Sequence, residues 1–234
     1  AGQGVECLAV LGGDVDLGGG TPVATVNLTV TNGTWTDIDA GLTGGLYDLD
    51  GTGKILTVDA SVLHDGGFAV GAGNMLHVQG DNADSQHLII DLTGVTAGDT
   101  FIPSNGIDFT GGEKPGGGDI DSLSVSGYTA ATVDTLIVSH EGPESGRIDL
   151  GGLGTIAYSE IEPLALGGTA ANLIINLPAG DDNTVQLSDH GLVGDGISRI
   201  SGAFELTTFV NPTVSLTIND GTGVKAISVQ GLDS

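Results

Sequence analysis

The residues best suited to chemistry are two neighbouring carboxylates in a tight turn. Asp181 and Asp182 lie side by side within residues 180–183, a Gly-Asp-Asp-Asn turn, and paired carboxyl groups can act as acid and base in the hydrolysis of a sugar polymer. The same run is ordinary turn chemistry, because Asp and Asn side chains bond to their own backbone. Aromatic residues, on which a sugar could stack, make up only 4% of the chain. We therefore expect turn carboxylates rather than a catalytic pair.

A second acidic segment is similar to a calcium-binding repeat. In the nonapeptide G-G-x-G-x-D-x-U-x, glycines make the turn and an aspartate supplies oxygen ligands to the ion. Residues 116–124 keep that aspartate as Asp121, but Asp119 replaces a glycine. Residues 220–228 carry Lys225 at the aspartate position, where an ammonium group would repel the cation. Calcium near Asp119 and Asp121 is possible, but we expect solvated turn carboxylates without a metal, and no other cofactor.

The histidines show no arrangement typical of a metal site. No two of them have the spacing at which neighbouring side chains share a metal ion. His77 and His87 lie at outward positions of alternating segments, so we expect both to be exposed to solvent. The five histidines are His64, His77, His87, His140 and His190.

Arginine is equally sparse, since Arg147 and Arg199 are the only two in the chain. A lyase acting on an acidic polysaccharide would need a cluster of cations to stabilise the developing charge. Two separate arginines do not provide one. We expect them to pair instead with nearby acids such as Asp149, Glu160 or Asp195.

Motifs for nucleophilic catalysis or phosphate binding do not occur. The chain has no G-x-S-x-G turn, no phosphate-binding loop and no C-x-x-C pair. Its single cysteine, Cys7, cannot form an internal disulfide, so we expect it to be inert or to bond to a second chain. We therefore assign no catalytic residue and expect no enzymatic activity.

The charge of the chain excludes some partners. It has 5 Lys and Arg against 30 Asp and Glu, a net charge of −25, and such a polyanion repels nucleic acid and anionic membranes. No apolar run is long enough to span a membrane. No basic segment precedes the apolar residues 7–11, so either a secretion signal has been removed or the chain is part of something longer.

Alternating apolar and polar residues predict many short strands. Val26, Leu28 and Val30 alternate with polar residues, as do the apolar positions between residues 214 and 218. Similar runs occur at residues 56–58, 76–78, 123–125 and 227–229. The 42 glycines predict many tight turns between them.

The strand pattern favours an all-β chain with stacked layers. Residues 159–166 could form one helical turn, limited by Pro163. Few aromatic residues and a largely aliphatic core favour a parallel β-solenoid, whose coils stack identical aliphatic layers. The alternative is a pair of β-sandwiches. We expect residues 1–100 to form a β-rich part continuous with a solenoid module at residues 101–234.

Two internal similarities support repeated structural units. Residues 88–92 (Leu-Ile-Ile-Asp-Leu) match residues 173–177 (Leu-Ile-Ile-Asn-Leu), and residues 76–80 match residues 227–231. Such self-similarity is the signature of stacked repeats. We interpret the matching segments as the same structural unit used more than once.

The second half of the chain also resembles a known class of protein. Its segments resemble the recurrent modules of giant bacterial extracellular surface proteins, which are similar to β-solenoids and often alternate with calcium-binding glycine-aspartate repeats. The resemblance implies a secreted or surface location and a structural or adhesive role, with no catalytic residues. It covers roughly residues 101–234 and rests on residues 102–107, 116–123, 156–164, 196–202 and 209–219.

The ends of a solenoid suggest how such a protein functions. Each end presents unpaired backbone groups, and residues 5–10 and 226–230 both read as strands that could accept a partner. We expect a non-catalytic extracellular structural protein, a whole subunit that stacks head to tail into a bacterial surface fibre. The alternatives are an adhesive module that binds a cell-surface or polysaccharide ligand and, less favoured, a polysaccharide-active β-helix.

Overall fold

The computed structural model describes the second half of the chain most fully. It describes residues 87–98, 102, 105–112, 120–180, 184–223 and 226–233, and the backbone of residue 86 and of the strands at residues 15–16, 26–28, 46–49, 54–59 and 76–80. These described parts are β-strands and loops with one 3-10 turn, Gly151–Leu153, and no α-helix. The prediction of an all-β chain is confirmed.

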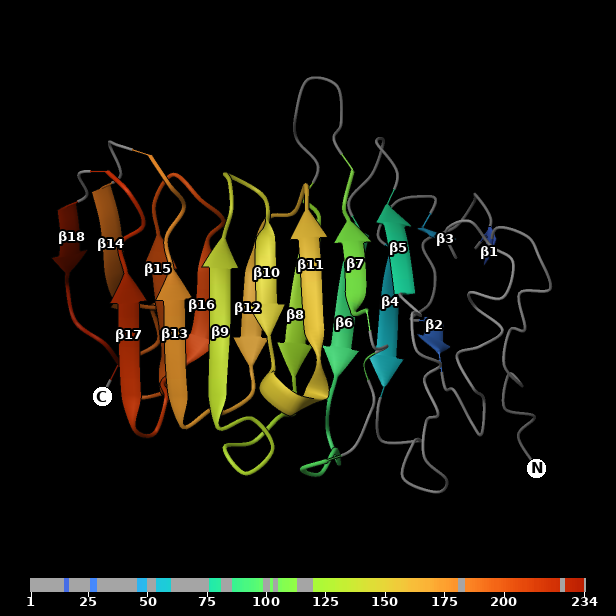
Figure 1. Cartoon of the computed structure of the whole chain (residues 1–234), viewed down its shortest axis with the longest axis horizontal. Helices are drawn as coiled ribbons and strands as arrows, with labels where there is room; N and C mark the ends of the chain where they lie inside the picture. The colour runs from blue at the N-terminus through green and yellow to red at the C-terminus, as the bar shows by residue number, and fades with distance from the viewer. Residues whose placement is uncertain are drawn as a thin grey trace.

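Within the described residues the strands form two nine-stranded sheets (Figure 1). We call them the front and rear sheets, after their places in that view. The front sheet has the order β1 (Val15–Asp16), β3 (Leu46–Leu49), β5 (Leu76–Gly80), β7 (Ile107–Thr110), β11 (Thr155–Ser159), β10 (Gly146–Asp149), β9 (Thr135–His140), β13 (Asn172–Asn176) and β17 (Ser215–Asn219). The rear sheet has the order β18 (Ala226–Val229), β14 (Thr184–Asp189), β15 (Ile197–Ser201), β16 (Thr207–Val210), β12 (Leu164–Gly167), β8 (Ser122–Ser126), β6 (Gln86–Asp91), β4 (Lys54–Asp59) and β2 (Val26–Leu28).

The first eight strands alternate between the two sheets. Each crossing brings the chain back one position further along, so β3, β5 and β7 pair in parallel, as do β4, β6 and β8. This pairing continues across residue 100, from β5 to β7 and from β6 to β8.

Two hairpin detours interrupt this order. After β8 the chain enters the front sheet three positions beyond β7, as β9, and then returns through β10 and β11 to fill the gap. The rear sheet repeats the detour with β14, β15 and β16 beside β12. Because β10 and β15 are antiparallel to both neighbours, the sheets are mixed and remain open. The expected uninterrupted parallel order is therefore wrong at these two strands.

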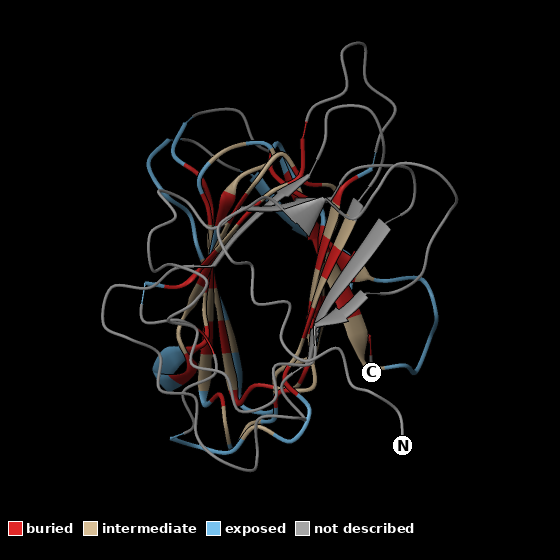
Figure 2. Ribbon diagram, turned by 90° about the vertical axis from the view of Figure 1, so that its right-hand side faces the viewer, coloured by how far each residue is buried: buried red, intermediate tan, exposed pale blue. Residues whose placement is uncertain are grey.

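The core lies between the sheets, where apolar side chains alternate with half-buried ones (Figure 2). Leu88 and Ile90 of β6 are fully buried, and so are Val138 of β9 and Ile175 of β13. The two similar segments at residues 88–92 and 173–177 share this burial pattern, although they lie in opposite sheets. The similar sequence therefore goes with the same core-facing positions but not with the same sheet.

The segment at residues 159–166 contains no helical turn. β11 ends at Ser159, Glu160 takes a positive φ of 55°, and β12 begins at Leu164 after the cis Glu162–Pro163 bond. The chain uses these residues to cross from the front sheet to the rear sheet. A bent, non-helical crossing replaces the expected helical turn because the two sheets must be joined within a few residues.

Gly146 is required where the front detour is tightest. It is the first residue of β10, which lies between β9 and β11. A Cβ atom there would overlap the backbone oxygen of Ser139 and the hydroxyl oxygen of Tyr158. Only a residue without a side chain lets the three strands close together.

The packing of the core predicts a contrast between two identical substitutions. Val138→Ala removes methyl groups from a fully buried site between the sheets and should lower the free energy of unfolding by about 2 kcal/mol. Val193→Ala changes a side chain that is 88% exposed and should cost less than about 0.5 kcal/mol. Urea unfolding followed by circular dichroism measures both values. Equal losses would contradict the placement of Val138.

Candidate functional site

The strongest candidate for a functional surface is the end of the molecule formed by β17 and β18, which we call the C-terminal edge (Figure 1). β17 pairs with β13 and β18 pairs with β14. Within the described residues neither strand has a neighbour on its outer side. Both sheets therefore end here in backbone N–H and C=O groups that a further strand could bind.

Core-facing side chains of the rear sheet are uncovered at this edge. Ile227 and Val229 of β18 are in register with Val185 and Leu187 of β14, both of which are buried. Ile227 is nevertheless 41% exposed and Val229 65% exposed. Ile227 and Val229 thus stand level with core residues of the neighbouring strand, but in the described part of the chain no further strand packs beside β18 to cover them.

The front sheet ends in the same way. Leu216 and Ile218 of β17 are in register with the buried Leu173 and Ile175 of β13, yet both are only half-buried. Val214, just before the strand, is largely exposed. The C-terminal edge thus presents apolar side chains from both sheets.

Side-chain hydrogen bonds run across the outer face of the front sheet towards this edge. Asn219 Nδ2 donates to Asn176 Oδ1 at 2.8 Å, and Asn176 Nδ2 donates to Ser139 Oγ at 2.8 Å. In a second row, Ser215 Oγ donates to Asn172 Oδ1 at 2.8 Å. Asn219 uses one half of its amide on the inner strand and has the other half available to an incoming strand.

The edge strands carry no ionisable side chain. Residues 215–219 read Ser-Leu-Thr-Ile-Asn and residues 226–229 read Ala-Ile-Ser-Val, in a chain with a net charge of −25. A partner strand that pairs with β17 or β18 therefore meets no like charge on the strand itself.

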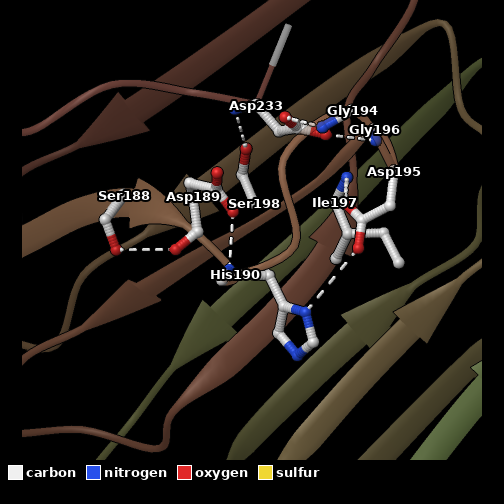
Figure 3. Close-up of polar contacts among 10 residues, drawn as sticks. Ser188, Asp189, His190, Gly194, Asp195, Gly196, Ile197, Ser198 and Asp233 are labelled. Carbon is white, nitrogen blue, oxygen red and sulfur yellow. Dashed lines mark hydrogen bonds and ion pairs between the residues drawn. The ribbon is translucent and has the colours of Figure 1, made fainter.

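The chain beyond β18 is held by a carboxylate in a backbone nest (Figure 3). The buried Asp233 side chain accepts hydrogen bonds from the N–H groups of Gly194, at 2.6 Å, and Gly196. Asn211 Nδ2 donates to the Asp233 carbonyl oxygen at 2.8 Å, and the Asp233 N–H donates to Ser198 Oγ at 3.2 Å. We call this set of contacts the tail clamp.

Two further carboxylates order the same loop between β14 and β15 (Figure 3). Asp189 Oδ1 accepts from the Gly191 N–H at 2.6 Å, and Asp195 Oδ1 accepts from the Ile197 N–H at 2.8 Å. His190 Nδ1 lies 4.0 Å from Asp195 Oδ2. These contacts hold the loop in place at the C-terminal end of the molecule.

A buried polar cluster lies between the two detours. His140 Nδ1 is 3.2 Å from the Tyr158 hydroxyl, and His140 Nε2 is 3.5 Å from Thr207 Oγ1. The imidazole also packs on the Phe204 ring, with centroids 4.5 Å apart. All four side chains are buried, so the cluster joins β9 and β11 of the front sheet to β16 of the rear sheet.

Burial determines the protonation of this cluster. Desolvation lowers the pKa of His140 to about 4, so the imidazole is neutral at neutral pH. Desolvation, assisted by the charges of Glu162 and Glu144, raises the pKa of the nearby Glu205 to about 8. Glu205 Oε1 is buried without a hydrogen-bond partner, which is consistent with a carboxyl group that carries its proton.

The structure places the predicted acidic residues only in part. Asp121 is almost fully buried, so the expected solvated turn carboxylate is wrong there, because the side chain faces the core side of β8. Asp119, Lys225 and Asp181–Asp182 lie outside the described residues. Among the described residues no three His, Cys, Asp or Glu side chains are grouped so as to hold a metal ion.

The basic residues also differ from their predicted environments. His87 is half-buried rather than exposed, because its Nδ1 lies 2.5 Å from Ser122 Oγ on the neighbouring strand. Desolvation lowers its pKa. His64 and the side chain of His77 lie outside the described residues, as does Cys7.

Neither arginine forms its expected ion pair within the described part of the chain. Arg199 Nε instead donates to Ser188 Oγ at 3.2 Å. Asp149 accepts from the Gly151 N–H at 2.8 Å, and Asp195 lies beside His190. The predicted pairs of Arg147 and Arg199 are therefore wrong.

Among the described residues no helix is long and apolar enough to span a membrane.

The chain matches no protein-family model, no curated protein and no solved structure. The resemblance to surface-protein modules therefore stays a prediction. A function has to be argued from the geometry of the C-terminal edge and of the buried polar cluster.

The raised pKa of Glu205 predicts a pH dependence of stability. Between about pH 4.5 and about pH 8 the unfolded chain releases a proton that the folded protein keeps. Glu205 therefore lowers the free energy of unfolding as the pH rises through this window, by at most about 1.4 kcal/mol per pH unit. Glu205→Gln removes the ionisation, so the variant should lose less stability than the wild type over this range.

Urea unfolding of both proteins at several pH values tests this expectation. His140 acts in the opposite direction, since its lowered pKa removes stability as the pH falls from 6.5 towards about 4. Wild type and variant both contain His140, so its effect cancels when the two stability curves are compared. Parallel stability curves for wild type and Glu205→Gln would show that Glu205 is ionised in the folded protein.

The tail clamp predicts local protection of two amides. Asp233→Ala removes the acceptors of the Gly194 and Gly196 N–H groups, which should speed their hydrogen exchange and lower stability by about 1–3 kcal/mol. Asp220→Ala, at an exposed carboxylate just after β17, is the matched control. Unchanged exchange at both glycines would contradict the clamp.

Proposed function

We propose that this protein is a non-catalytic extracellular structural protein that assembles into a surface fibre. Copies join end to end, with a strand of one copy added to the C-terminal edge of the next. The observation that carries the proposal is the simultaneous opening of both sheets at β17 and β18, with core-facing apolar side chains left uncovered on both. The surface location rests on the acidic composition and on the resemblance to surface-protein modules.

Strand direction supports head-to-tail stacking. In the front sheet β17 runs in the same direction as β1, because the two antiparallel pairings of β10 cancel and all other pairings are parallel. The same reasoning through β15 gives β18 the direction of β2. A simple translation of one copy along the sheets therefore keeps the edge strands of both sheets parallel to the strands that they approach.

The finer fold follows from the same pattern. We infer that the chain coils as a solenoid in which two antiparallel hairpins are inserted. The alternation of β1 to β8 between sheets, and the parallel placement of β12, β13, β17 and β18, support this interpretation. An open-ended coil of this kind can be extended by another copy without a change of geometry.

Electrostatics favours growth along one direction. Each copy carries a net charge of −25, so side-by-side contacts between fibres are repulsive. The edge strands have no ionisable residue. The strands of the C-terminal edge therefore add no like charge of their own to an end-to-end contact.

The magnitudes indicate that both sheets must take part. Covering Leu216, Ile218, Ile227 and Val229, which are only partly exposed, contributes on the order of 1 kcal/mol for each side chain. Association costs roughly 4–15 kcal/mol in lost freedom. Apolar contact alone barely offsets the lower limit of this association cost. The backbone hydrogen bonds of two new strand pairs, each bond contributing about 1 kcal/mol, are therefore needed.

Fibre formation by this edge predicts the effect of one charge. Ile227→Lys places an ammonium group in the core row of the edge strand, where a covering strand would bury it without a partner. We expect fibres of the wild type by electron microscopy and sedimentation, and at least a tenfold smaller sedimenting fraction for the variant, or about 1.4 kcal/mol.

Ile120→Lys is the matched control, because Ile120 is 55% exposed and precedes β8 in the middle of the rear sheet. It should assemble like the wild type. A wild-type protein that stays monomeric over a wide range of concentration and salt would refute the proposed function, as would fibres that form equally well with Ile227→Lys.

A further inference from the structure

Register can be followed across the whole rear sheet, from the C-terminal edge to β2. Each pairing fixes which residues stand level with each other, so a single row connects the two ends. This row consists of Val229, Leu187, Ile200, Thr207, Leu164, Leu123, Leu88, Leu56 and Val26.

The row belongs to the core throughout its described length. Its six members from Leu187 to Leu88 are all buried. At the C-terminal edge it ends in Val229, which is 65% exposed. At the other end of the sheet it reaches the position of Val26, in a strand that pairs only with β4 among the described residues.

We propose that one copy binds the next through β18 and β2, in the register that sets Val229 opposite Val26. The inference rests on the proposed function and names, for the same site, the partner strand of the second copy and its register. It follows from translation along the sheet, because a copy that keeps every level of the row continues the core of the first copy into the core of the second.

The neighbouring positions fit the same register. One residue further on, Gln230 comes opposite Asn27. Asn and Gln both carry amides that can donate and accept, and an amide pair, Asn176 and Asn219, already joins two neighbouring strands of the front sheet. The strand β2 reads Val-Asn-Leu and, like β18, carries no charge.

The rear sheet determines the register because its edge strands are uncharged and apolar. The corresponding strand of the front sheet, β1, reads Val-Asp and so carries a charge. A shift of one residue would set Val229 opposite Asn27 and break the period-two match between the two strands. A shift of two residues keeps the faces and sets Val229 opposite Leu28, so it is the competing arrangement.

Thiol cross-linking between two single-cysteine variants separates these registers. In a Cys7→Ser background, Val229→Cys protein is mixed with an equal amount of Val26→Cys protein and treated with dibromobimane, which becomes fluorescent when it bridges two nearby thiols. A parallel mixture uses Leu28→Cys in place of Val26→Cys. We expect a fluorescent covalent dimer in the first mixture, at a yield about tenfold above that of the second mixture. In the second mixture the cysteine at position 28 lies two residues along β2 from the position opposite Val229, so the two thiols are further apart.

Sedimentation of each mixture before cross-linking separates the two proposals, and circular dichroism confirms that the variants are folded. Assembly with preferred cross-linking to Val26→Cys supports the register. Assembly with preferred cross-linking to Leu28→Cys, or with no cross-link, overturns the register and leaves the fibre function standing. Folded variants and wild type that do not assemble overturn both.

Discussion

Each strand of this fold buries its inward aliphatic side chains only while another strand lies against it. The core is a set of rows that run along the sheets, in which Leu187, Leu123 and Leu88 occupy equivalent levels. Stability therefore accumulates strand by strand, and the last strand is always incompletely buried. Exposed apolar residues at β18 follow from this rule and are not an irregularity of the sequence.

The buried polar cluster adds specificity to a core that is otherwise uniform. Aliphatic rows would allow the two detours to slide by one level at little cost, since the side chains are similar. His140 on β9 and Thr207 on β16 meet across the core, and a shift of either detour would leave their polar atoms unpaired. We interpret the cluster as the contact that fixes the detours against each other.

Much of the strand pattern could be predicted from the sequence, whereas the detours could not. Alternation identifies Leu123 and Val125 as core residues, because period two is a local property. The reversal at β10 depends on which distant strand fills the gap beside β7, and no local signal encodes that. Burial of Asp121 was missed because its turn resembles a solvated repeat, and the role of Asp233 was missed because its partners lie 37 and 39 residues away.

The detours have a consequence for the order in which the polypeptide acquires structure as it is made or exported. Up to β8, every new segment can settle on a neighbour that already exists. β9 cannot, since the position beside β7 belongs to β11, which has still to emerge. Residues 135–159 must therefore form their three-stranded meander as one unit before it docks. The sheets of the emerging chain therefore form one strand at a time up to β8, and afterwards by the addition of several strands together.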